Sequence, residues 1–171
     1  LRFTGGTTGA PKAVMYSTDN FMANRDLHFA MADPVAVRQE RLLHFGMISH
    51  ASGMVFFPVL FKGGCTLTMN DRSMLTFCSA VERERVTASL MVPSMLYRML
   101  DDPEVAKHDL SSLQTVYYGA SPMSPTRLKQ LHQRFGNIFV QLYGSSEHPG
   151  AVSALSKAEH QPDLNGSEAH L

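Results

Sequence analysis

Short apolar segments alternate with amphipathic ones along most of this chain, and the connections between them are short. Continuous apolar segments of four to eight residues are typical of buried strands, and segments with a period near 3.6 are typical of helices. Strands are expected at 41–47, 65–69, 87–92, 113–118 and 137–142, and helices from Ser17 to before Pro34, at 52–61, from Ser73, at 93–100 and from 124 to about 134. This alternation predicts an α/β fold with a largely parallel sheet.

Three polar loops come directly after expected strands. They are residues 4–12, which follow a first strand at the start of the chain, residues 119–124 and residues 143–148. Ligands of open parallel sheets bind at the carboxyl ends of the strands. We therefore expect the three loops to face one site, although the order of the strands cannot be read from the sequence.

The first loop has the composition of an anion-binding turn. Residues 3–14 read F-T-G-G-T-T-G-A-P-K-A-V. Glycines let the backbone approach a ligand closely, and successive backbone N–H groups in such a turn form a concavity that binds anions. Threonine hydroxyls and the Lys12 ammonium, which follows a proline that stiffens the loop, add further donors. The residues predicted to hold phosphate are Thr4, Gly5, Gly6, Thr7, Thr8, Gly9 and Lys12.

A flexible Gly/Thr turn is the alternative interpretation of the same residues. The stretch is also not the common P-loop, which requires G-x-x-x-x-G-K-[ST]. In this chain Ala10 and Pro11 separate Gly9 from Lys12, and Ala13 stands where the P-loop has its Mg²⁺-binding hydroxyl. A polyphosphate site of a different kind is therefore predicted.

The third loop carries residue types that suit a nucleotide. Residues 141–147 read Q-L-Y-G-S-S-E. The Tyr143 ring can stack on a flat base, Gly144 allows close approach, and Ser146 offers a hydroxyl to a phosphate oxygen. Glu147 is a hard carboxylate of the kind that binds Mg²⁺ together with phosphate. A simple exit from a strand with an ordinary surface glutamate remains the alternative.

Both loops resemble the signatures of AMP-forming adenylating enzymes, which include acyl-CoA synthetases, aryl-CoA ligases, luciferases and adenylation domains of peptide synthetases. The first signature reads [ST]-[STG]-G-[ST]-T-G-x-P-K-G, from which Gly5 and Ala13 depart, and the second reads [NQ]-x-Y-G-x-T-E, in which Ser146 replaces threonine but keeps the hydroxyl. The segment G-A-S-P-M at 119–123 is similar to a third family segment and precedes Gln141 in the family's order.

The resemblance implies a role for each matched residue. Gly119, Ala120 and Ser121 would form one wall of an adenine site, and Gln141, Tyr143 and Gly144 the other. Ser146 would bind the α-phosphate and Glu147 the Mg²⁺. The segment M-I-S-H-A-S-G-M resembles the family's H-x-x-G stretch, which implies that His50 and Ala51, with Gly144, contact the acyl group. A lone histidine is more often structural, so His50 keeps that alternative.

Composition excludes several classes of protein. Among 171 residues, 15 basic and 15 acidic residues cancel, and no basic stripe favours nucleic acid as a partner. The longest apolar run is far shorter than the roughly 20 residues of a membrane span. Cys65 and Cys78 have no disulfide or zinc spacing, so two thiols in a reducing cytoplasm are expected. The eight histidines form no H-x-x-x-H or H-E-x-x-H cluster.

The resemblance covers about residues 1–152, which are expected to be part of the ATP-binding subdomain of a longer enzyme, with 153–171 as a polar tail or loop. It implies a parent ligase that uses ATP, Mg²⁺ and coenzyme A to activate a carboxylic acid, and a fragment that is inactive alone. The apolar segment after His50, Met54–Leu60, favours a fatty or other hydrophobic acid. An amino-acid adenylation domain and a non-catalytic nucleotide-binding module are the alternatives; residues 49–56 lack the acidic residue that the former would use to pair a substrate amine.

Overall fold

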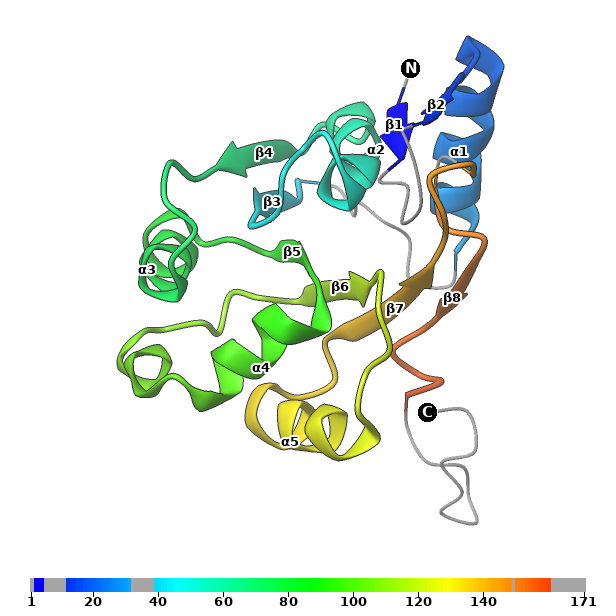
Figure 1. The fold of residues 1–171 in the computed structure, drawn as a ribbon. Helices are drawn as coiled ribbons and strands as arrows, with labels where there is room; N and C mark the ends of the chain where they lie inside the picture. The colour runs from blue at the N-terminus through cyan, green and yellow to red at the C-terminus, as the bar shows by residue number, and fades with distance from the viewer. Residues whose placement is uncertain (1, 5–11, 32–38, 149, 161–171) are drawn as a thin grey trace.

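The chain forms an α/β domain around one main sheet, in a computed structural model that describes residues 2–4, 12–31, 39–148 and 150–160. The sheet has six strands in the order β4-β3-β5-β6-β7-β8 (Figure 1). All neighbouring pairs are parallel except β7 and β8, which run antiparallel. The predicted α/β class with a largely parallel sheet is confirmed.

The strands of the main sheet are β3 (Arg41–His44), β4 (Cys65–Thr68), β5 (Ala88–Met91), β6 (Thr115–Gly119), β7 (Phe139–Tyr143) and β8 (Ser153–Leu155). Every residue of β5 and β6 is buried, as expected for central parallel strands that are covered on both faces. A tail or loop is expected from residue 153 on the sequence, but residues Ser153–Leu155 form the edge strand β8. A three-residue strand is too short to show a period in the sequence.

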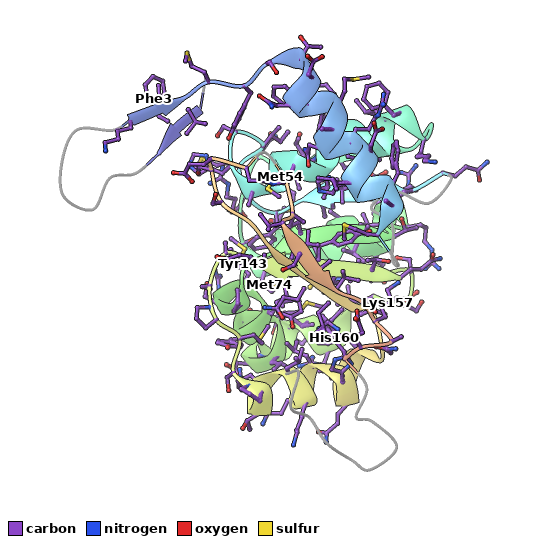
Figure 2. All side chains as sticks on the ribbon, turned by 90° about the vertical axis from the view of Figure 1, so that its right-hand side faces the viewer. Phe3, Met54, Met74, Tyr143, Lys157 and His160 are labelled. Carbon is purple, nitrogen blue, oxygen red and sulfur yellow. The ribbon has the colours of Figure 1, made fainter. Side chains whose placement is uncertain are left out.

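The first expected strand is not part of this sheet. β1 (Arg2–Thr4) and β2 (Lys12–Val14) form an antiparallel pair of their own, in which Thr4 is opposite Lys12. The pair projects from the body of the molecule, and Phe3 on it is exposed (Figure 2). The expectation that residues 4–12 follow a strand of the main sheet is therefore wrong.

Helices cover both faces of the sheet. α3 (Met74–Glu84), α4 (Pro93–Asp101) and α5 (Pro125–Phe135) lie on one side, while α1 (Thr18–Ala30), the 3-10 helix η1 (Ala51–Val55) and α2 (Phe56–Phe61) lie on the other (Figure 1). A second 3-10 helix, η2 (Pro103–Lys107), follows α4. The predicted apolar helix at 52–61 is thus divided into η1 and α2.

Local sequence signals explain where the helices begin and end. Ser17 caps α1 by accepting from the Asn20 amide, and the Asn20 side chain accepts from the Ser17 amide in return. Ser73 caps α3 by accepting from the Thr76 amide, while α4 and α5 both begin at a proline. α5 ends at Gly136, whose φ of 79° suits glycine.

Candidate functional site

A cavity of about 210 Å³ lies at the carboxyl ends of β5, β6 and β7. Five residues that the sequence singled out line it, and they come from three separate segments: Ala51, Gly119, Ala120, Gly144 and Ser146. β6 and β7 are neighbours in the sheet, so the two polar loops that follow them meet, as the sequence predicted. This is the edge of a parallel sheet at which ligands usually bind.

The first wall of the cavity is a tight approach of two backbones. A Cβ on Gly119 would lie 2.1 Å from the Leu142 carbonyl oxygen, so no other residue fits there without a shift of β6 or β7. The next residue, Ala120, has φ of 67°, in the left-handed region that costs a residue with a Cβ roughly 1 kcal/mol. Such strained backbone concentrates at functional sites.

The second wall is the turn after β7. A Cβ on Gly144 would lie 2.2 Å from the Gly150 carbonyl oxygen, so the two ends of the turn pack directly against each other. Ser146 is half-buried in the turn, whereas Glu147 is exposed. Hydrogen bonds from its own backbone amide and from the Ser145 side chain lower the pKa of Glu147, which is therefore a carboxylate at neutral pH.

Several predicted residues lie beside the cavity without lining it. Tyr143 ends β7 with 67% of its surface exposed, and Gln141 is half-buried two residues earlier in the same strand. Ser121 is exposed directly after Ala120. His50 is exposed immediately before η1, with its Nδ1 3.4 Å from the Ser49 hydroxyl.

The phosphate-loop prediction falls mostly outside the described residues. Gly5, Gly6, Thr7, Thr8 and Gly9 are not among them. The structure does place the two ends of the loop: Thr4 and Lys12 are opposite each other in the β1–β2 pair. The side chain of Lys12 is exposed.

Sequence reasoning missed the apolar part of the cavity. Met54, Leu90, Tyr118 and Leu142 line it, together with Ser145. Leu90, Tyr118 and Leu142 occupy strand positions whose pattern predicts a place in the core. The one signal that could have identified them is that they lie near strand ends, next to the motifs. Met54 begins the apolar segment after His50, from which a fatty or other hydrophobic acid was expected as the substrate.

A second histidine shapes the η1 side of the cavity. His44 ends β3 and is buried, with its Nδ1 2.8 Å from the Ser52 hydroxyl in η1. Burial lowers the pKa of His44, and the interaction with Ser52 offsets part of that effect. A neutral His44 thus fixes η1, and with it Ala51 and Met54, to the sheet.

The described residues contain no group of three or more His, Cys, Asp or Glu side chains that could hold a metal ion without a ligand's help. Glu147 offers a metal one exposed carboxylate. Mg²⁺ is commonly bound by one or two carboxylates plus the phosphates of a nucleotide, so this donor set fits a metal that arrives with a nucleotide.

The family model described as AMP-binding enzyme matches residues 1–168. The chain belongs to this family. A medium/long-chain-fatty-acid–CoA ligase from Mycobacterium tuberculosis is 40% identical over 160 residues, which cover 94% of this chain and 28% of the ligase. A feruloyl-CoA synthase from an Amycolatopsis species is 34% identical over 169 residues, or 98% of this chain and 34% of the synthase.

Solved structures agree with this membership of the AMP-binding enzyme family. The amide bond synthetase McbA from Marinactinospora thermotolerans superposes with a TM-score of 0.83 at 32% identity, over 92% of this chain and 31% of that protein. The chain thus spans about a third of the length of these relatives. Within the described residues, no helix combines the length and apolar character needed to cross a bilayer.

Proposed function

We propose that this chain is the ATP-binding part of a ligase that joins a carboxylic acid to the thiol of coenzyme A. One observation carries the proposal: the loop after β6, which resembles a family segment, and the loop after β7, which resembles a family signature, follow adjacent parallel strands and meet at one cavity. Membership of the AMP-binding enzyme family and the names of the two ligase relatives support it.

ATP would lie along the carboxyl edge of the sheet. The adenine would be held between the Gly119–Ser121 backbone and the segment of Gln141, Tyr143 and Gly144. Ser146 would bind the α-phosphate, and Lys12 with residues 4–9 would bind the β- and γ-phosphates. The exposed, ionised carboxylate of Glu147 would hold the Mg²⁺ that accompanies ATP and offsets phosphate charge.

The reaction would proceed in two balanced steps. A carboxylate oxygen of the acid attacks the α-phosphorus of ATP, which forms an acyl-adenylate and releases pyrophosphate. The thiolate of coenzyme A then attacks the acyl carbon and releases AMP. Because a carboxylate is already a nucleophile at neutral pH, the protein's contribution is positioning and neutralisation of charge, not proton abstraction.

A hydrophobic acid is the proposed substrate because part of the cavity lining is apolar. Ala51, Met54 and Leu90 make one side of it apolar, and this side begins immediately after His50, the residue proposed to guide the carboxylate. The relatives act on a fatty acid and on ferulate by name, so both aliphatic and aromatic acids belong in the test. The cytoplasmic location expected from the thiols stays a prediction; both cysteines are free in the structure.

Exchange of labelled pyrophosphate into ATP tests the proposal. The assay uses full-length protein that contains this chain, with octanoate, palmitate, benzoate, ferulate and a set of amino acids, and the 171-residue chain in parallel. Exchange that depends on a hydrophobic acid supports the proposal, and a silent 171-residue chain supports the need for further domains. Exchange confined to amino acids would establish the adenylation-domain alternative. ATP binding without exchange for any acid would favour a non-catalytic module.

The Lys12→Ala variant sharpens this assay. Loss of one charged hydrogen bond to phosphate should weaken use of ATP by about 1–3 kcal/mol, which raises the KM for ATP. Lys107→Ala is the matched control, because Lys107 is an exposed lysine in η2 that pairs with Glu104 at 2.7 Å. Equal kinetics for Lys12→Ala and Lys107→Ala would remove Lys12 from the site.

A further inference from the structure

The turn that carries Ser146 and Glu147 is attached to the start of the chain at two places. The first is Tyr16, which lies two residues after β2 and one before the cap of α1. Its hydroxyl donates a hydrogen bond to the backbone carbonyl of Ser146, 130 residues away in the sequence. The Tyr16 ring is half-buried and packs edge-on against Phe21, with 5.6 Å between centroids.

The second attachment is at the far end of the same turn, on α1. A Cβ on Gly150 would lie 1.7 Å from the Asn24 Oδ1 and 3.0 Å from the His28 Cε1, so Gly150 is packed directly onto these two side chains. The His28 Nδ1 lies 2.7 Å from the Asn24 carbonyl oxygen, which accepts a hydrogen bond from it. Burial lowers the pKa of His28, so the ring is neutral at neutral pH.

Packing alone does not explain this arrangement. α1 buries the polar Asn24 and His28, while its apolar Phe21, Met22 and Leu27 are substantially exposed. A helix stabilised only by its core would present the opposite face. The inward polar residues and Tyr16 share one partner, which is the backbone of the turn after β7.

We infer that Tyr16 is a positioning residue, which fixes the Ser146–Glu147 turn relative to the strand that carries Lys12, while Asn24 and His28 support the turn at Gly150. The inference rests on the function proposed above, in which Lys12, Ser146 and Glu147 bind successive parts of one MgATP. Tyr16 follows Lys12 by four positions, so its hydrogen bond connects the segment that carries Lys12 to the turn that carries Glu147. An enzyme of this kind contributes to catalysis by holding Lys12 and Glu147 at the correct distance from each other around one MgATP.

The Tyr16→Phe variant tests the inference, because it removes only the hydroxyl and keeps the ring against Phe21. Tyr97→Phe is the matched control: the Tyr97 hydroxyl accepts a backbone hydrogen bond from Ser124 at 2.8 Å, outside the cavity. In full-length protein, Tyr16→Phe should raise the KM for MgATP about 3- to 10-fold, the loss expected for one neutral hydrogen bond. Tyr97→Phe should leave this KM unchanged, and both variants should melt at similar temperatures.

Hydrogen exchange of the ligand-free proteins gives an independent reading. Amides of residues 145–148 should exchange faster in Tyr16→Phe than in the wild type or in Tyr97→Phe, since the turn has lost an attachment. Unchanged exchange, or faster exchange with an unchanged KM for MgATP, would overturn the inference. An inactive wild-type protein would instead count against the proposed function, and the two failures are thereby distinguished.

Discussion

The two faces of the sheet are packed in different ways. On the face of α3, α4 and α5, one large cluster of buried side chains includes Phe77, Met99 and Leu131, none of which is exposed to solvent. On the face of α1 and α2, a smaller cluster surrounds Val55 and Val59, and the helices leave large apolar side chains exposed. Phe57, in α2, has 52% of its surface exposed.

The smaller cluster, on the face of α1 and α2, lies closer to the cavity than most of the larger one. Two of the cavity's apolar residues, Leu90 and Leu142, belong to the smaller cluster, and Ala51 packs against it. Asn24 and His28, which support the turn after β7, come from α1 on that same face. Of the larger cluster on the α3–α5 face, Tyr118 lines the cavity. The rest of this larger cluster serves as the rigid base from which the site on the other side is built.

The largest expected effect contrasts two phenylalanines, one from each face. Phe77→Ala empties a fully buried position whose ring contacts Phe45 at 5.3 Å between centroids, and should lower the free energy of unfolding by about 3–5 kcal/mol. Phe57→Ala, on the α1–α2 face, should cost no more than about 1 kcal/mol, because half of its surface is already in water. Urea denaturation measures both, and equal losses would contradict the comparison.

A pair of glycine variants gives the next largest effect. Gly119→Ala places a Cβ 2.1 Å from a backbone oxygen in the sheet, and the required shift should cost about 1–3 kcal/mol and weaken ATP binding at the adjacent cavity. Gly63→Ala meets no atom within 4 Å but has φ of 75°, so it should cost only about 1 kcal/mol and leave ATP binding unchanged. Thermal melting and ATP titration separate the two; equal ATP affinity would show that the β6–β7 approach does not shape the site.

The smallest expected effect is a pH dependence that involves one histidine from each face. Burial lowers the pKa of His28, next to Asn24 and His148, and the pKa of His132, next to His160 and the Gly136 backbone. The unfolded chain takes up a proton near pH 6.5 and the folded chain does not. The stability contribution of each histidine is therefore complete above about pH 6.5 and is lost as the pH drops below it, until the lowered pKa of the folded state is reached.

Single glutamine variants test this dependence. His28→Gln and His132→Gln should each flatten the decrease in melting temperature between neutral and mildly acidic pH. A curve as steep as that of the wild type would show that the substituted histidine does not titrate differently in the folded and unfolded chains. Unequal flattening would show which face is more sensitive to acid.

Local signals made the helices and the central strands predictable. The caps Ser17 and Ser73 and the initial prolines of α4 and α5 act through neighbouring residues, so the sequence alone reveals them. β8 and the β1–β2 pair have strands of three residues each, and their pairing depends on distant partners.

The site was predictable only where its residues belong to motifs. Gly144 and Ser146 were expected at a site because their residue types suit a nucleotide, and Gly119 and Ala120 because their segment resembles one of the family; all four line the cavity. Tyr16 could not be found in this way, since its partner is a backbone carbonyl 130 residues away and its neighbours in the sequence carry no signal. Contacts of that kind are set by the tertiary fold alone.

The position of Tyr143 has a consequence for the thermodynamics of binding. Its backbone is fixed by β8, since the Val152 amide donates to the Tyr143 carbonyl at 2.7 Å, while its ring remains in solvent. A base that stacks on this ring would immobilise one side chain with few torsions, at a cost of about 0.5–1.5 kcal/mol, and would not have to order any main chain. Nucleotide association through Tyr143 should therefore carry a small unfavourable conformational entropy.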